Sequence, residues 1–502
     1  MLLPALLLLF AAALSMRTSQ HCCNELGQCL PAQVLIPNMK NYTAYNKRWS
    51  DTASAQPACI FLPRSTDHVA TAVRVFTAGG LQNHTCHFAI VSGGTSTGPG
   101  ANDIDGGITL DLSLMDRAAL NHNQTVAYIQ PAASWPNVYN AFKGTGHTVA
   151  GGDNTAVAGM VLAGGISLFQ GRMGFSADNV VNYQMVDATG EILNVDRSSH
   201  PDLFLALKGG GNNFGIVTRV DMKPIRQSSL IWGGETTVPM NATSAVLSSL
   251  DFFVRNSGMD PASGARVTFS WNGTAGGITN FMWNTINDRS QTSLMPFFGI
   301  GPQISSKMQN NISLSDLIPH NQMRNDPHVH RSMFATVTVI SSNCTLFDVN
   351  RWTNAIIHNY QYLKGVEWRW SYDPLPNFYR NGGVNVMGLN YTKADLMIVS
   401  FNPSWSDPAY DKDITLAAKA WVNAIQQETN VRNTSYPFEY LGYAAPFQDP
   451  FASYGASNLQ FLQDTAKKYD PTGVFQTLVP GGFKLSRAGQ KASRPTLNLP
   501  PA

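Results

Sequence analysis

The sequence predicts a folded protein of the α+β class with more than one structural unit. Its 502 residues are enough for a large hydrophobic core. Hydrophobic residues make up 43% of the chain and charged residues only 13%, a balance typical of globular and not of disordered proteins. The 42 glycines and 28 prolines indicate many turns between short helices and strands.

The first half of the chain, from residue 57 to 224, alternates short apolar runs, glycine turns and helical patterns. A strand at 59–63 precedes a helix at 65–79, for which Ser65 is the candidate N-cap. The apolar run 87–91 predicts a strand that ends in a glycine turn. Further strands are expected at 106–113, 125–133 and 182–195, the last with a hairpin turn at 188–191.

From about residue 231 to 411 the composition changes to Trp, Tyr, Phe and Asn. Strands are expected at 265–273 and 333–342, and aromatic strands of this kind make good walls for an organic ligand. The segment 368–372, which reads WRWSY, can be a pocket wall or a buried stripe of the sheet, and we favour the stripe. A helix near the end of the chain should stop at Asp470-Pro471.

The N-terminal residues 1–20 are interpreted as a secretory signal peptide, because an apolar run too short to span a bilayer ends in small residues. A buried N-terminal segment is the alternative. We predict a secreted, N-glycosylated protein without a membrane span. Net charge is +2 with no basic run, which argues against nucleic acid as a partner. The Asn-x-Ser/Thr sequons lie at Asn41, Asn83, Asn123, Asn241, Asn272, Asn311, Asn343, Asn390 and Asn433.

Six cysteines are present, five of them within the first ninety residues. In an oxidising compartment they predict disulfides that attach an N-terminal arm, residues 21–56, to the first domain. The pairing stays open, although adjacent Cys22 and Cys23 should have different partners. No metal site is predicted, because the cysteine spacing lacks a C-x₂-C pair. His328 and His330 resemble a metal pair but are better read as a solvated loop.

Glycine clusters recur four times within the first half, at 93–100, 151–152, 164–165 and 209–215. Glycine permits positive φ and a close approach of the backbone to a ligand. Backbone N–H groups in such turns bind anions, so the four clusters together predict a phosphate-bearing ligand. One cluster alone would be read as a turn. Neither the Rossmann G-x-G-x-x-G pattern nor a Walker A loop occurs.

Residues 94–98 read GTSTG and match the nucleophile elbow of serine hydrolases, with Ser96 as the nucleophile. That elbow needs a helix directly after the turn. The residues that follow, 99–107, read PGANDIDGG and cannot begin a helix promptly. The hydrolase therefore stays a remote alternative, and Ser96 is better read as a hydroxyl of the ligand-binding loop.

Four segments, 57–75, 86–113, 150–193 and 200–218, strongly resemble the flavin-binding domain of the vanillyl-alcohol oxidase superfamily. Residues 469–485 resemble the end of its berberine-bridge-enzyme-like branch, in the style of secreted fungal FAD-linked oxidases. The resemblance implies a two-subdomain PCMH-type FAD-binding domain at 57–226 and an α+β substrate domain with a large antiparallel sheet at 227–450. It also implies a C-terminal segment at 451–485 that returns to the FAD domain, and a disordered tail at 486–502.

The resemblance also assigns cofactor-binding residues. Ser92 to Ser96 match the pyrophosphate loop, and a second run lines the flavin. A third group falls where relatives hold the adenine end or the pyrophosphate. The residues carried over are Ser92, Gly93, Gly94, Thr95, Ser96, Gly152, Val157, Gly159, Gly164, Gly165, Asn179, Val180, Gly215, Ile216 and Val217.

Two departures from the family pattern concern flavin attachment. Many relatives have a histidine that bonds covalently to the flavin where this chain has Thr95, and a cysteine where residues 151–155 read GGDNT. Threonine cannot make a histidyl–flavin bond. The resemblance therefore implies FAD held without covalent links.

The implied activity is that of an FAD-dependent oxidase. It would dehydrogenate an organic alcohol or a related secondary-metabolite intermediate and pass the electrons to O₂. Tyr391 and Tyr443 are the candidate bases, with Tyr440 and Glu439 as further options. A flavin-dependent oxidative cyclase and a redox-silent, metabolite-binding member are the alternatives. Substrate identity and oligomeric state are not predicted.

Overall fold

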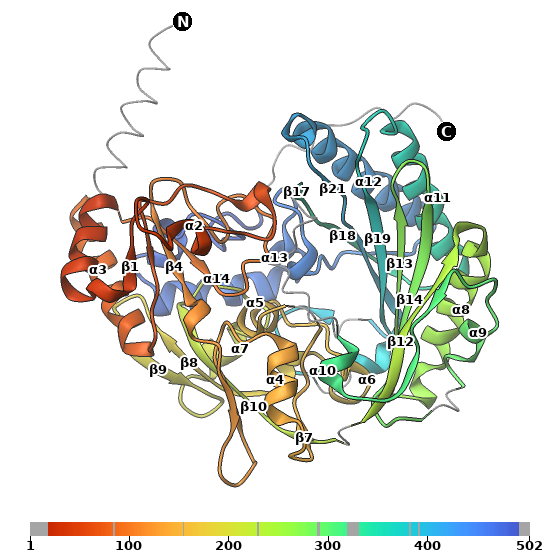
Figure 1. Cartoon of the computed structure of the whole chain (residues 1–502), viewed down its shortest axis with the longest axis horizontal. Helices are drawn as coiled ribbons and strands as arrows, with labels where there is room; N and C mark the ends of the chain where they lie inside the picture. The colour runs from red at the N-terminus through yellow and green to blue at the C-terminus, as the bar shows by residue number, and fades with distance from the viewer. Residues whose placement is uncertain are drawn as a thin grey trace, which may run out of the picture.

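The computed structural model describes residues 19–83, 86–153, 155–227, 230–288, 292–318, 331–380, 383–389 and 392–490. The ribbon shows two halves side by side (Figure 1). One half holds the N-terminal elements together with the last helices of the chain. The other half is built on one large sheet whose outer side is covered by helices.

The first half begins with a four-stranded sheet in the order β1-β2-β4-β3. Strands β2, β4 and β3 are parallel, and helix α3 (Thr66–Asn83) connects β2 to β3. The predicted N-cap is confirmed, because the Ser65 hydroxyl accepts a bond from the His68 amide at 3.3 Å. The strands are β1 (Val34–Leu35), β2 (Cys59–Phe61), β3 (Phe88–Val91) and β4 (Ile108–Asp111).

The second sheet of this half is antiparallel, in the order β5-β6-β10-β8-β9. The predicted hairpin is confirmed: the Asp187 amide bonds to the Glu191 carbonyl at 3.0 Å, and Gly190 takes a φ of 81°. Helices α4 (Trp135–Phe142), α5 (Val157–Leu162) and α7 (Pro201–Ala206) also belong to this half. Its strands are β5 (Ala118–Leu120), β6 (Ala127–Ile129), β8 (Val180–Val186), β9 (Ile192–Val195) and β10 (Ile216–Met222).

The other half is a nine-stranded antiparallel sheet, as the resemblance implies. Helices α8 (Thr243–Asn256), α11 (Asn343–Asn359) and α12 (Asp411–Val431) share one hydrophobic core with its outer face. The strands are β12 (Ile231–Pro239), β13 (Ser263–Trp271), β14 (Gly276–Asn284), β15 (Ser305–Ser306), β16 (Gln309–Ile312), β18 (Ala335–Ile340), β19 (Trp368–Leu375), β20 (Leu396–Phe401) and β22 (Ser435–Tyr436).

Alternation along β13 and β19 decides which side chains meet the helices. Trp368, Trp370 and Tyr372 are fully buried in the helix-side core, and Phe269 stacks on Trp370 at 5.0 Å. The interpretation of 368–372 as a sheet stripe is therefore confirmed. Because successive side chains point to opposite faces, Arg266 and Asp373 lie on the inner face, toward the first half.

The C-terminal helices α13 (Pro450–Ser453), α14 (Ala456–Tyr469) and α15 (Val474–Thr477) pack on the first half. The Phe88 amide of β3 bonds to the Leu478 carbonyl at 2.8 Å. Helix α14 ends at Tyr469, as predicted. The Asp470 carboxylate then accepts bonds from the amides of Val474 and Phe475 at 2.8 and 2.7 Å.

Two disulfides, Cys22–Cys86 and Cys23–Cys59, attach the helical residues 19–29 to the first sheet. The adjacent cysteines do have different partners, and an arm tied to the first domain is confirmed. Cys29 and Cys344 are free and exposed.

Several sequence predictions concern membranes, metals and termini. None of the described helices has the length and apolarity that crossing a membrane requires. Among the described residues no three His, Cys, Asp or Glu side chains gather as metal ligands. Residues 1–18 of the predicted signal peptide 1–20, the histidines His328 and His330, and residues 491–502 of the predicted disordered tail lie outside the described residues. The first five residues of that tail, 486–490, are ordered instead, and the Gly489 amide donates to the Asp449 carboxylate at 2.7 Å.

Candidate functional site

A cavity of about 520 Å³ lies between the two halves of the molecule. This volume is in the range of sites for organic ligands. Its walls come from the loop after β3, from α5 and its approach, from the turn before β10, from the inner face of the sheet, and from residues 440–446 and 480–487.

The loop 92–98 after β3 forms the floor of the cavity. Gly93 packs so closely that a Cβ there would lie 2.8 Å from the Cβ of Ala156. Gly94 has a φ of 67°, which glycine adopts without strain. The Trp49 amide donates to the Gly94 carbonyl at 3.1 Å. In a trans peptide the C=O and the following N–H point in opposite directions, so the N–H of Thr95 points away from Trp49. The loop is thus built to present backbone donors, as an anion needs.

The C-terminal turn closes the cavity against this loop. A Cβ on Gly481 would lie 1.6 Å from the Gly100 carbonyl oxygen, so only glycine fits there. Arg487 lines the cavity from an exposed position, and its guanidinium donates to the Pro480 carbonyl at 2.5 Å. The turn therefore adds a cation near the mouth.

The structure brings nine of the predicted cofactor-binding residues to the cavity wall, and the other six do not line it. The Asn179 amide, for example, donates to the Met173 and Phe175 carbonyls at 2.8 and 2.9 Å. The nine are Ser92, Gly93, Gly94, Thr95, Ser96, Gly159, Gly215, Ile216 and Val217; the six are Gly152, Val157, Gly164, Gly165, Asn179 and Val180.

Sequence reasoning missed a charged cluster at the inner face of the sheet, in which Asp373 is buried and Arg266 and Asp153 are partly buried. The Arg266 guanidinium contacts the carboxylates of Asp373 and Asp153, each at 2.5 Å. Arg266 and Asp153 line the cavity. Burial raises the pKa of Asp373, while Arg266 opposes that shift. The sequence did offer one signal, because residues 369, 371 and 373 alternate with the aromatic residues of the strand and so share its other face. That signal does not show that Asp373 meets Arg266, which depends on the pairing register of this strand with β13.

Aromatic side chains form the wall beside this cluster. Phe334 stacks on Tyr443 at 5.6 Å with an interplanar angle of 14°, and Tyr440 meets Tyr443 edge-on at 5.0 Å. All three line the cavity. Burial raises the pKa of Tyr443 well above its usual value, with Asp373 adding to the shift, so its phenol stays protonated at neutral pH.

The other candidate bases differ from Tyr443 in their placement. Tyr391 is outside the described residues. Glu439 accepts a bond from the Asp449 amide at 2.9 Å and does not line the cavity. The Tyr440 hydroxyl accepts from the Ile166 amide at 3.4 Å. Tyr440 and Tyr443 both line the cavity, and Tyr443 is the one that interacts electrostatically with Arg266 as well as with both carboxylates.

Ser96 lacks the surroundings of a hydrolase nucleophile. Its hydroxyl accepts a bond from the Gly98 amide at 3.3 Å, and no helix follows within residues 99–107. No histidine is among the described residues that line the cavity. Ser96 instead belongs to the glycine-rich loop 92–98 that lines the cavity.

These features fit FAD. The glycine-built loop suits a pyrophosphate, and the aromatic wall and the charged cluster border the same cavity on the sheet side. Neither histidine nor cysteine is among the described residues that line the cavity. The fold and site together define an FAD-linked oxidoreductase.

Comparisons with known proteins agree. Residues 57–196 match the model of an FAD binding domain. The FAD-dependent monooxygenase sdcF of Emericella nidulans is 32% identical over 498 residues, covering 94% of this chain and 99% of the relative. The FAD-dependent monooxygenase tpcD of Cochliobolus heterostrophus is 33% identical, covering 86% of each chain.

Solved structures share the fold at lower identity. Xylooligosaccharide oxidase from Myceliophthora thermophila superposes with a TM-score of 0.72 at 20% identity, covering 90% of this chain and 97% of that one. Physcomitrella patens BBE-like 1 superposes with a TM-score of 0.70 at 17% identity, covering 90% and 98%. The chain belongs to the family of FAD-dependent oxidoreductases that includes the fungal FAD-dependent monooxygenases sdcF and tpcD, and it shares its fold with Physcomitrella patens BBE-like 1.

Proposed function

We propose that this protein is an FAD-dependent oxidase that dehydrogenates an organic alcohol or a related secondary-metabolite intermediate, with O₂ as the electron acceptor. The observation that carries the proposal is the cluster of Asp153, Arg266 and Asp373 beside Tyr443, at the same cavity as the loop 92–98, here called the cofactor loop. An alcohol must lose a proton as it is oxidised, and this cluster can receive one.

The charges of the cluster support this role. Two carboxylates share the one guanidinium of Arg266, so the three side chains together carry a formal charge of −1 when both carboxylates are ionised. Tyr443 has a phenol held protonated by burial. We assign Tyr443 to orient the substrate hydroxyl and relay its proton to the carboxylates, so that no free phenolate has to form. Arg266 keeps both carboxylates in place.

Bound FAD would supply the two-electron acceptor that none of these side chains can provide. The chain's own part is to hold the cofactor by the loop 92–98 and to orient the substrate. We propose that FAD is bound without covalent links, since Thr95 stands at the attachment position. By contrast, glucooligosaccharide oxidase from Acremonium strictum has a 6-S-cysteinyl, 8α-N1-histidyl FAD.

The substrate side of the cavity favours an aromatic or otherwise apolar organic molecule over an oligosaccharide. Phe334, Tyr440, Leu441, Tyr443 and Pro446 line it. Anaerobic screening of benzylic alcohols against xylo- and cello-oligosaccharides, followed by loss of the visible flavin absorption, tests this. Faster reduction by the oligosaccharides would contradict the proposal. A flavin that no substrate reduces, but that photoreduces normally, would favour the redox-silent alternative.

A second candidate function is monooxygenation, favoured by the names of the sequence relatives. The two reactions differ in the fate of oxygen. Turnover of an identified substrate under ¹⁸O₂ should give labelled H₂O₂ and an unlabelled product if the protein is an oxidase. Labelled product would establish the monooxygenase, and a new ring in the product would establish the oxidative cyclase.

We further propose that the protein passes through the secretory pathway. The two buried disulfides support this, and so do the sequons, because every sequon asparagine with a described side chain is exposed. The protein should be secreted from a fungal host, and treating the secreted protein with N-glycosidase should lower its apparent mass. An unchanged mass would contradict the prediction. The seven exposed asparagines are Asn41, Asn123, Asn241, Asn272, Asn311, Asn343 and Asn433.

A further inference from the structure

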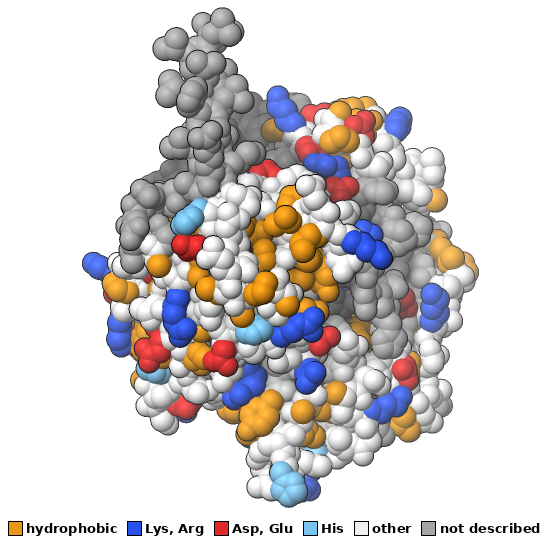
Figure 2. Space-filling view, turned by 60° about the vertical axis from the view of Figure 1, so that its left-hand side comes forward, with side chains coloured by type: hydrophobic (Ala, Val, Ile, Leu, Met, Phe, Trp, Pro, Cys, Tyr) orange, Lys and Arg blue, Asp and Glu red, His pale blue; other side chains and the backbone are white. Residues whose placement is uncertain are grey.

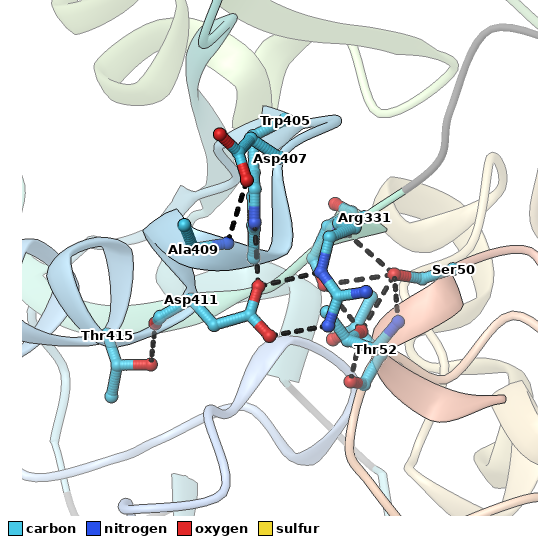
Figure 3. Close-up of polar contacts among 10 residues, drawn as sticks. Ser50, Thr52, Arg331, Trp405, Asp407, Ala409, Asp411 and Thr415 are labelled. Atoms are coloured by element: carbon cyan, nitrogen blue, oxygen red, sulfur yellow. Dashed lines mark hydrogen bonds and ion pairs between the residues drawn. The ribbon is translucent and has the colours of Figure 1, made fainter. Parts of the chain in front are cut away.

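The N-terminal arm contacts both the cofactor loop and the segment 331–334 of the second half through residues 48–52. Ser50 is fully buried and caps the short helix η2 (Asp51–Ala53). Its hydroxyl and that of Thr52 lie beside the strand that begins at Arg331 (Figure 3). The arm therefore reaches across the junction of the two halves.

The three shortest bonds at this junction form one continuous chain. The Ser332 amide donates to the Ser50 hydroxyl at 2.7 Å, the two hydroxyls of Ser50 and Thr52 lie 2.7 Å apart, and Thr52 donates to the Thr97 carbonyl at 2.8 Å. Each hydroxyl has one proton. The contacts of both hydroxyls with the Ser332 carbonyl are longer, at 3.2 and 3.0 Å. The favoured arrangement thus runs from Ser332 through Ser50 and Thr52 to Thr97, and hydrogen bonds in such a chain strengthen one another.

The substrate-side end of the chain is firmly held. Strand β17 (Arg331–Ser332) pairs with β21 (Ser404–Trp405). The Arg331 guanidinium makes a bidentate pair with Asp411, at 2.6 and 2.5 Å, and the Trp405 indole donates to the same carboxylate at 2.9 Å (Figure 3). Ser332 is therefore a fixed point of the second half.

The other end lies in the floor of the cavity. Thr97 belongs to the cofactor loop, whose Gly94 carbonyl is held by the Trp49 amide. The Trp49 ring lies 6.0 Å from that of Phe334, which stacks on Tyr443. The arm itself is anchored by a buried ion pair between Arg48 and Asp103 at 3.3 Å. One short segment thus contacts the cofactor loop and the aromatic wall at once.

We propose that Ser50 and Thr52 are positioning residues for the flavin: the hydrogen-bond chain through their hydroxyls fixes the cofactor loop relative to the substrate-side wall. Neither side chain lines the cavity, so they act through Thr97 and Ser332. The inference rests on FAD binding at the loop 92–98.

Paired variants at Thr52 test the proposal. Thr52→Val keeps the shape of the side chain but removes the donor to Thr97, whereas Thr52→Ser keeps the hydroxyl. The FAD dissociation constant, measured by flavin fluorescence, should rise about tenfold in Thr52→Val and stay within about twofold of wild type in Thr52→Ser. Thr71→Val is the matched control, because its hydroxyl donates to the Asp67 carbonyl on the exposed side of α3.

Hydrogen exchange supplies a readout that needs no free FAD. Amides of residues 92–98 should exchange faster in Thr52→Val than in wild type and Thr52→Ser, in the protein as purified. Equal flavin affinity and equal exchange in Thr52→Val and wild type would overturn the proposal, and so would equal losses in the Val and Ser variants. Wild-type protein that binds no FAD at all would instead contradict the cofactor assignment. The exchange comparison would then still show whether the hydrogen-bond chain from Ser332 to Thr97 orders the loop 92–98.

Discussion

Arg266 and Asp373 face each other across neighbouring strands, with the guanidinium Nε 2.5 Å from the carboxylate Oδ1. Each is the chain neighbour of a paired residue, because Val267 of β13 lies opposite Tyr372 of β19. The second contact of Arg266, with Asp153, comes from the other half of the molecule. One guanidinium therefore joins the sheet to the cofactor-side wall and holds two carboxylates beside Tyr443.

Replacement of Tyr443 should separate binding from chemistry. Tyr443→Phe removes the hydroxyl that relays the proton, so flavin reduction by substrate should slow by about 10²-fold or more, with FAD affinity unchanged. Anaerobic stopped-flow absorption measures both. Tyr454→Phe is the control, since its buried hydroxyl donates to the Gly209 carbonyl at 3.0 Å away from the cavity lining. Reduction at the wild-type rate in Tyr443→Phe would remove Tyr443 from the mechanism.

The glycine at the C-terminal turn should be indispensable for cofactor binding. A methyl group on Gly481 would lie 1.6 Å from the carbonyl oxygen of Gly100 and 2.2 Å from its carbonyl carbon. The backbone at residue 481 would therefore have to move away from the cofactor loop. Gly481→Ala should purify with little or no FAD, as the ratio of flavin to protein absorption will show. Gly27→Ala, where a Cβ would contact nothing within 4 Å, should keep its full complement. Full FAD content in Gly481→Ala would show that the turn does not shape the site.

Lys484 should make stability depend on pH above neutrality. Burial lowers its pKa from 10.5 to about 7, with Arg487 adding to the shift and Asp470 opposing it. Between about pH 7 and 10.5 the unfolded chain binds more protons at this residue than the folded chain. Its contribution to the free energy of unfolding therefore rises with pH across this window and is smallest below it. Urea titrations of wild type and Lys484→Met at several pH values measure the difference. The free energy of unfolding of Lys484→Met should exceed that of wild type by the largest amount at pH 7 and below. If the difference between the two proteins does not change with pH, the pKa of Lys484 is not depressed.

The Cys22–Cys86 disulfide should stabilise the first sheet by closing a long loop. Its cysteines are 64 residues apart, and removing such a crosslink typically costs about 2–4 kcal/mol. Cys22→Ser with Cys86→Ser should lower the thermal midpoint, measured by scanning calorimetry. Cys29→Ser, at an exposed free cysteine, should leave it unchanged. Equal midpoints for all three proteins would show that the crosslink constrains nothing beyond the packing around it.

Much of the fold follows from local signals in the sequence. The strands around Ile60, Ile90 and Ile108 are short apolar runs between turns, and the cap at Ser65 and the helix stop at Asp470-Pro471 depend on neighbours only a few residues away. The loop 92–98 could be found because its glycines and hydroxyls match a known motif. These features are local, so the sequence by itself determined them.

The charged cluster and the arm could not be found this way. Arg266, Asp373 and Asp153 come from three separate segments, and Ser50 meets Ser332 from 282 residues away. Nothing near Ser50 or Thr52 in sequence marks them as part of a ligand site, since each looks like an ordinary turn residue. The pairing register of β13 with β19 and the packing of the two halves bring these groups together. Only the tertiary structure decided that the charged cluster and the arm's hydrogen-bond chain form. The free energy of an ion pair or of a hydrogen-bond chain depends on distances between segments, which local sequence does not specify.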